Sequence, residues 1–95
     1  MTTSELLRAA RALIDKPQKW CKRYDFLHGR HCARGALLEV TDGLDRSGFL
    51  LHRTVSLLER ATPGDRLMNY NDRHTHAEVM ALFDRAIALA EKGDA

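Results

Sequence analysis

Long apolar runs are absent from this sequence of 95 residues, and their absence excludes a membrane-spanning helix. Such a helix needs roughly 20 predominantly apolar residues to cross a bilayer. The first residues, Met1 to Glu5, also lack the basic group and the apolar stretch of a signal peptide. We therefore expect a cytoplasmic protein without a membrane partner.

Cysteine is also scarce, because the chain carries only Cys21 and Cys32. Without an export signal, a reducing compartment and two free thiols are favoured over a disulfide. A chain of this length can enclose one hydrophobic core, so we predict a single helical domain over residues 1–95. The hydrophobic fraction of 44% and the charged fraction of 29% are those of an ordinary globular protein and exclude a disordered chain.

Helical periodicity appears in four segments and predicts an all-α fold, a compact bundle of about four helices. Two segments begin with a Thr-x-x-Glu capping box, at Thr2 and at Thr75, which satisfies free amides at a helix start. The first segment runs from Thr2 to the break at Pro17, the second from about Cys32 to Thr41, the third from Asp45 or Ser47 to the break at Thr62, and the fourth from Thr75 to Gly93.

The second helical segment has an inner face of small residues, Ala33, Gly35 and Ala36. Small residues let a neighbouring backbone come closer than Leu or Ile would. We therefore predict that another part of the chain approaches this helix closely.

Two long connections separate the predicted helices. Residues 17–31 contain three aromatic residues and a His28-Gly29 turn, which favours either a short hairpin or an ordered loop. Residues 62–74 are predicted as a loop, and long loops without regular structure are often functional. These two connections also carry most of the candidate site residues.

Charge is distributed unevenly along the chain, although the net charge is only +2. Residues 1–35 hold eight basic and three acidic side chains, whereas the rest of the chain holds seven basic and ten acidic ones. Such asymmetry can indicate an anionic partner. It can equally be neutralised within the fold or across a dimer, so both interpretations stay open.

Three motifs occur in order: Trp20-Cys21, then Cys32-Ala33-Arg34-Gly35-Ala36-Leu37, then Asn71-Asp72-Arg73 before the last helix. Together they resemble a small family of bacterial and phage proteins of unknown function, with a Trp near the end of helix one, a Cys-x-x-Gly-Ala-Leu segment and a Trp-Asn-Asp motif that leads into the last helix. This sequence departs from the pattern at Tyr70, which keeps an aromatic ring but adds a hydroxyl. The resemblance implies one domain and supplies no activity. A bacterial, phage or mobile-element origin is part of our functional hypothesis.

The most distinctive polar cluster lies at Asn71, Asp72 and Arg73. Beside Tyr70, and with Trp20 as a further aromatic contact, these residues are our candidate binding site for a ligand or a partner backbone. A structural role is the alternative, and we favour it for Asn71 and Asp72, because Asn and Asp readily form local turns with their own backbone.

Cysteine and histidine residues suggest a third kind of function. Cys32 at a helix start is a candidate nucleophile, with His74 or His76 as its base and Asp72 as the orienting carboxylate. A zinc site would draw on the same residue types, but the spacing of the two cysteines does not match that of structural zinc sites. We predict no metal and no cofactor. The residues whose convergence the sequence leaves open are Cys21, Cys32, His28, His31, His74 and His76.

The sequence contains no complete catalytic constellation, so it favours a non-enzymatic binding protein. The partner we expect is a protein, either a second copy of this chain or a host factor. Nucleic acid is the alternative partner, because basic and aromatic residues alternate between Lys16 and Tyr24, where cations can contact phosphates and a ring can stack on a base. An enzyme or metal protein that uses the thiols and imidazoles is the second alternative.

Overall fold

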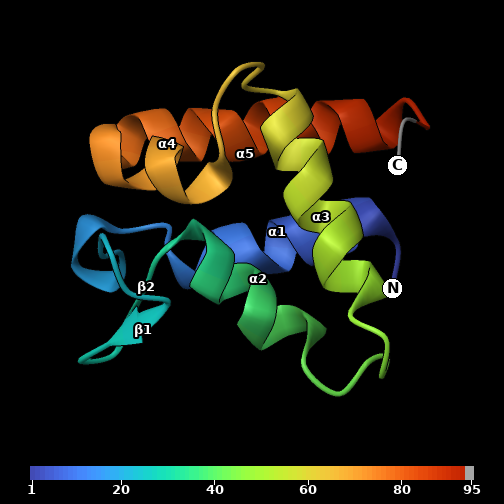
Figure 1. Cartoon of the computed structure of the whole chain (residues 1–95), viewed down its shortest axis with the longest axis horizontal. Helices are drawn as coiled ribbons and strands as arrows, with labels where there is room; N and C mark the ends of the chain where they lie inside the picture. Colours follow the sequence, from blue (N-terminus) through green and yellow to red (C-terminus); the bar gives the residue numbers. More distant parts are fainter. Residues whose placement is uncertain (94–95) are drawn as a thin grey trace.

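The computed structural model describes residues 1–93, which form five α-helices, one 3₁₀ turn and one small hairpin (Figure 1). In chain order these are α1 (Thr3–Leu13), the 3₁₀ turn η1 (Pro17–Lys19), β1 (Phe26–Leu27), β2 (Arg30–His31), α2 (Ala33–Thr41), α3 (Phe49–Arg60), α4 (Leu67–Arg73) and α5 (His76–Glu91). The fold is therefore mostly helical, as predicted, with a two-stranded antiparallel sheet added to the helices.

The prediction of about four helices is confirmed only in part, because residues 1–93 contain five: the segment 62–74, which was predicted as a loop, contains α4. Leu67 and Asn71 lie one helical turn apart, and both are buried. The Glu59 carboxylate accepts a hydrogen bond from the Leu67 amide at 2.8 Å, at the start of the helix. Tertiary contacts thus stabilise a seven-residue helix that would be marginal in isolation.

The predicted helix starts are largely confirmed. Both capping boxes are present, with Thr2 and Thr75 as N-caps of α1 and α5. The start of α3 uses both of the residues that the sequence offered: the Asp45 carboxylate accepts from the Leu50 amide at 3.1 Å, and the Ser47 hydroxyl accepts from the Phe49 amide at 3.2 Å. The residue that directly precedes the helix is Gly48, in the left-handed conformation.

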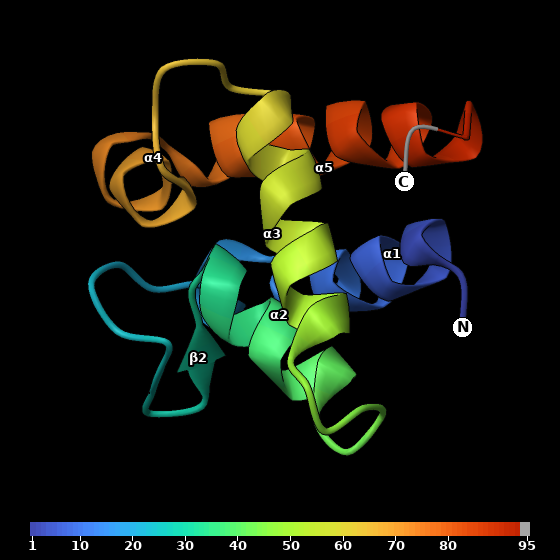
Figure 2. The ribbon, with the colours of Figure 1, turned by 45° about the vertical axis from the view of Figure 1, so that its right-hand side comes forward.

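The core lies between α1, α5 and α2, and α3 crosses it (Figures 1 and 2). Helices α1 and α5 run antiparallel, so that the end of α5 lies beside the start of α1 (Figure 1). Each helix contributes one apolar face, which is why an amphipathic sequence period suffices to build this arrangement. The fully buried large side chains include Leu6, Leu7, Ile14, Leu37, Leu58, Leu82 and Phe83.

The connection 17–31 contains a hairpin, which was one of the two predicted possibilities. Residues His28 and Gly29 both have positive φ, 51° and 78°, as a tight hairpin turn requires. Phe26 is paired with His31 across the two strands. The chain before the hairpin lies along β2, where the Cys21 amide donates to the His31 carbonyl at 3.0 Å.

Part of the charge asymmetry is neutralised inside the fold. Arg8 of α1 pairs with Glu91 of α5, and Arg11 pairs with Asp84 at 2.8 Å. Each of these exposed ion pairs contributes little to stability. Together they pair two of the excess positive charges of the N-terminal third with carboxylates of α5. Among residues 1–93, no helix is long and apolar enough to span a membrane.

Candidate functional site

Asn71 is the point at which the family-like motifs meet. Its side chain is 1% exposed, and its carbonyl oxygen accepts from the Trp20 indole N–H at 2.7 Å and from the Ala33 amide at 3.0 Å. Its amide nitrogen donates to the Cys21 carbonyl at 3.0 Å. One buried side chain on α4 therefore joins the segment before the hairpin to the start of α2.

Trp20 is half-buried and packs against the core. Besides the bond to Asn71, its ring lies 5.6 Å from the ring of His76, whose Nε2 lies 2.6 Å from the Ile14 carbonyl. Because the ring is half-buried and lies beside His76, Trp20 exposes less of its surface to an external base than a fully exposed aromatic residue would.

The other three candidate binding residues lie around Asn71 in different settings. The Asp72 carboxylate accepts from the Arg23 amide at 2.8 Å, where Arg23 has a positive φ of 75°. Tyr70 is half-buried and stacks on His74 with ring centroids 3.7 Å apart. Arg73 is exposed. Asn71 and Asp72 thus use long-range bonds to hold the 20–23 segment, rather than the local turns that we expected.

Gly35 of α2 receives the close backbone approach that the sequence predicted. An added Cβ on Gly35 would lie 1.7 Å from the Asp25 carbonyl oxygen, which is far inside any allowed contact. The same carbonyl accepts from the Cys32 amide at 3.3 Å. The Asp25 carboxylate also pairs with Arg34 at 2.6 Å, so the hairpin base is fixed to the first turn of α2.

Three apolar side chains at the hairpin face solvent: Tyr24, Phe26 and Leu27 are 56%, 60% and 37% exposed. We call these three residues the hairpin face. Sequence reasoning treated the 17–31 aromatic residues as a group and did not separate the buried from the exposed ones. The signal that was available is the tight His28-Gly29 turn, which places the neighbouring strand residues at the tip of a narrow projection.

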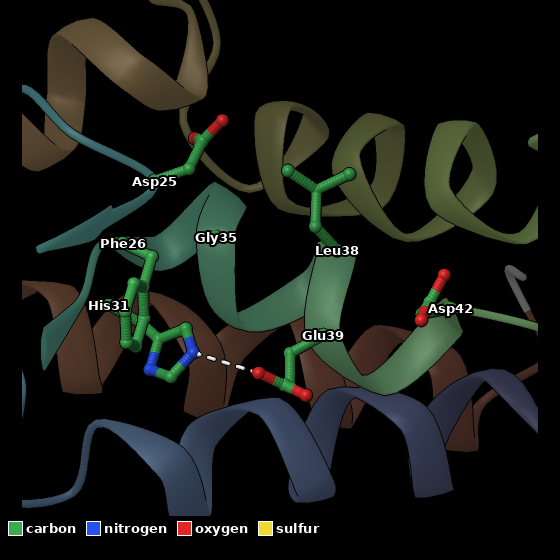
Figure 3. Close-up of a pocket in the computed structure, with 7 residues that line it drawn as sticks. All are labelled: Asp25, Phe26, His31, Gly35, Leu38, Glu39 and Asp42. Atoms are coloured by element: carbon green, nitrogen blue, oxygen red, sulfur yellow. Dashed lines mark hydrogen bonds and ion pairs between the residues drawn. The ribbon is translucent and has the colours of Figure 1, made fainter. Parts of the chain in front are cut away.

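A groove of about 310 Å³ adjoins the hairpin face, between β1, β2 and α2 (Figure 3). Its apolar wall includes Phe26 and Leu38, and its acidic side includes Glu39 and Asp42. His31 lies in the groove, with Nε2 3.1 Å from the Glu39 carboxylate and its ring 5.0 Å from that of Phe26 (Figure 3). The groove is shallow, but it extends the exposed apolar surface toward a group of carboxylates.

The thiols do not form the arrangement that a nucleophile requires. Cys32 is 3% exposed, and its sulfur accepts from the Gly35 amide at 3.3 Å and lies 3.5 Å from the Asp25 carboxylate, not beside an imidazole. Burial raises the pKa of the Cys32 thiol to about 11, and the neighbouring carboxylate adds to the shift. Burial also raises the pKa of Cys21. The expected thiolate at the helix start is therefore disfavoured, because desolvation raises the pKa of Cys32 more than the hydrogen bond from the Gly35 amide lowers it.

The histidines of the proposed triad have other partners. His74 Nδ1 lies 2.9 Å from the Tyr70 carbonyl, and His76 contacts the Ile14 carbonyl. Asp72 is engaged by the Arg23 amide. Within residues 1–93, no group of three or more His, Cys, Asp or Glu side chains is arranged to hold a metal ion.

Slow thiol chemistry is the expected experimental signature of Cys32. In a Cys21→Ser variant, we expect a disulfide reagent at pH 7.5 to label the folded chain at least about 100-fold more slowly than the unfolded chain, because little thiolate forms at this pKa. The rate should rise roughly tenfold per pH unit. Absorbance of the released thiol gives both rates; rapid labelling independent of pH would contradict the assignment.

The same thiol makes the fold sensitive to alkali. The folded pKa of about 11 lies above the ordinary value of 9.0, so the folded chain holds the proton more tightly than the unfolded chain. The tighter proton binding contributes on the order of 2–3 kcal/mol to the free energy of unfolding. This contribution is fully present below pH 9 and is lost as the pH rises toward 11. Urea denaturation between pH 8 and 11 measures the loss, and a Cys32→Ala variant should lack this part of it.

Comparison with models of protein families gives a match over most of the chain. The model of a family described as a family of unknown function (DUF6197) covers residues 1–89. No curated protein and no solved structure matches the chain. The family match agrees with the resemblance of the three motifs to a family of unknown function, and it assigns no activity.

Proposed function

We propose a function from the structure itself, because the chain belongs to DUF6197, a family of unknown function. In this proposal the protein is a non-enzymatic binding module, and it binds another protein through the hairpin face and the adjoining groove. The first partner to test is a second copy of the same chain. A bacterial, phage or mobile-element origin is part of the same proposal.

One observation carries the proposal: Tyr24, Phe26 and Leu27 are exposed together at a hairpin whose base is hydrogen-bonded to α4 and to the start of α2. Aromatic side chains bury large areas at protein interfaces with little loss of conformational freedom. The base of the hairpin is fixed by Asn71 and by the Gly35 contact, so the face is preformed. A preformed apolar surface loses less entropy on binding than a flexible loop does.

Charge around the hairpin favours a protein over a polyanion. Lys22, Arg23 and Arg30 lie on the same projection, but the groove beside Phe26 presents Glu39 and Asp42. A phosphate backbone that followed the aromatic residues would meet these carboxylates, and like charges repel. A protein surface can present both signs of charge next to apolar groups, which matches this mixture.

Self-association is measured by sedimentation velocity and light scattering at protein concentrations between 5 and 500 µM. We expect a concentration-dependent dimer that is lost in a Tyr24→Ser/Phe26→Ser double variant. Phe49→Ser is the matched control, because Phe49 is 55% exposed and is the first residue of α3, which starts on the opposite side of the molecule from β1 and β2 (Figure 1). It should dimerise like the parent chain.

A strict monomer would remove the second copy as the partner. The partner would then be a host protein, which is tested with a photoreactive phenylalanine incorporated at position 26. This probe should crosslink one host protein. The same probe at position 49 should not crosslink that protein. A monomer without a crosslink specific to position 26 would contradict the proposed function.

Nucleic acid is the second candidate partner, and one observation favours it. Lys22, Arg23 and Arg30 make no ion pair within residues 1–93, and they flank the exposed rings of Tyr24 and Phe26. Binding through phosphates weakens steeply with salt. Fluorescence anisotropy of labelled DNA and RNA at low salt tests this candidate, and no binding at tens of micromolar protein would reject it.

A further inference from the structure

A second cavity, of about 430 Å³, lies between α3 and α4 and reaches the first turn of α2. It is separate from the groove beside the hairpin, and no residue lines both. Its volume falls in the range of small-molecule sites in proteins. Its apolar lining comes from Val55, Leu67 and Met68, and Met68 is 44% exposed at its edge.

The polar lining of this cavity contains two arginines, Arg34 and Arg66, together with His52, Ser56, Asn69 and one carboxylate residue, Glu59. Arg66 is exposed and makes no ion pair within the described chain, and Arg34 spends one donor of its guanidinium on Asp25. A guanidinium has five N–H donors in a planar fork, so both arginines keep donors for a ligand.

The one carboxylate in the cavity already has a partner. Glu59 accepts a hydrogen bond from the Leu67 amide at 2.8 Å, and it thereby secures the start of α4. Two arginines and one acid therefore line the cavity, which leaves one positive charge in excess among these three side chains. Arginine is the side chain best suited to carboxylate and phosphate groups, because its fork matches two oxygens at once.

We propose that this cavity binds a small organic oxyanion, a carboxylate or a phosphate monoester attached to an apolar body. The oxyanion pairs with Arg66 and Arg34, and the apolar body packs against Val55 and Met68. This site does not depend on the proposed protein interface, because none of these residues belongs to the hairpin face.

Benzoate, phenyl phosphate and the neutral benzyl alcohol test the site in a titration followed by two-dimensional NMR of the backbone amides. We expect benzoate or phenyl phosphate to shift the amides of residues 52–59 and 66–69, with a dissociation constant on the order of 1–10 mM. Tighter binding of phenyl phosphate would identify a phosphate ligand, and tighter binding of benzoate a carboxylate ligand. Benzyl alcohol should bind more weakly than either anion.

Arg66→Gln should weaken anion binding about five-fold or more, since it removes one charge from the cavity. Arg85→Gln is the control, because it makes the same change of charge at an exposed α5 position outside the cavity. It should leave the dissociation constant within about two-fold. Unchanged binding in Arg66→Gln, equal binding of benzyl alcohol, or no amide shifts at 20 mM anion would each overturn the proposal.

Discussion

Replacement of Asn71 by Ala is expected to lower the free energy of unfolding by about 3–5 kcal/mol. The change removes the acceptor of the Trp20 indole N–H and of the Ala33 amide, and the donor to the Cys21 carbonyl. A polar group that stays buried without a partner costs about 1–3 kcal/mol. These costs do not add fully, because water can reach part of the opened site. Urea denaturation followed by far-UV circular dichroism measures the difference.

The matched control for this substitution is Asn69→Ala. Asn69 lies on the same short helix but is exposed, so the variant makes the same chemical change without opening the buried network. We expect it to change stability by no more than about 0.5 kcal/mol. If Asn71→Ala were as mild as Asn69→Ala, Asn71 would not be the residue that joins these segments.

Trp20→Phe separates the hydrogen bond from the packing of the ring. It removes the indole donor but keeps an aromatic side chain, so a loss of about 1–2 kcal/mol is expected. In an Asn71→Ala background the same change should cost less, because the acceptor of that bond is already absent. Additive losses in the double variant would show that Trp20 and Asn71 stabilise the fold independently.

The long helices and their starts could be predicted from sequence because local signals determine them. A Thr-x-x-Glu capping box at Thr2 or Thr75 satisfies amides within four residues of itself. An apolar period over three or more turns then indicates the face that is buried. The His28-Gly29 turn is likewise local, since the two residues themselves adopt the required positive φ.

Helix α4 could not be predicted in this way, because its support is not local. Asn71 and Asp72 have low helix propensity, and as neighbours in sequence they are typical of turns. In the fold their side chains bond to residues about 40 to 50 positions earlier in the chain. Hydrophobic periodicity contains no information about such long-range hydrogen bonds. The sequence could therefore indicate that Asn71 and Asp72 form a distinctive polar cluster, but not which residues they bond to.

For the candidate site, too, the locally determined features could be predicted from the sequence and those that depend on distant contacts could not. The aromatic and basic character of residues 17–31 was visible in the sequence, whereas the exposure of Phe26 and the burial of Cys32 depend on how the hairpin packs against α2. A helix start favours a thiolate, but the sequence does not show that Cys32 is desolvated. The cavity between α3 and α4 was hidden for a simpler reason: α4 itself was not predicted.

Gly35→Ala is expected to destabilise the fold by about 3 kcal/mol or more, or to displace the hairpin. In a helix interior, Ala is normally favoured over Gly by about 1 kcal/mol, so propensity alone predicts a gain in stability. At this position the new Cβ would lie 1.7 Å from the Asp25 carbonyl oxygen, and backbone atoms cannot rotate away as a side chain can. The opposite sign of the two effects makes the measured direction decisive.

Gly43→Ala provides the matched control for that experiment. Gly43 has a φ of 76° and nothing within 4 Å of an added Cβ, so the substitution introduces backbone strain without a clash. We expect it to cost about 1 kcal/mol. Thermal denaturation compares the two variants, and amide NMR shifts at residues 20–31 report displacement of the hairpin. If the Gly35→Ala chain were at least as stable as the parent and its hairpin amides were unshifted, the Asp25 backbone would not pack against α2. The hairpin face would then lack the fixed base on which its proposed role in binding depends.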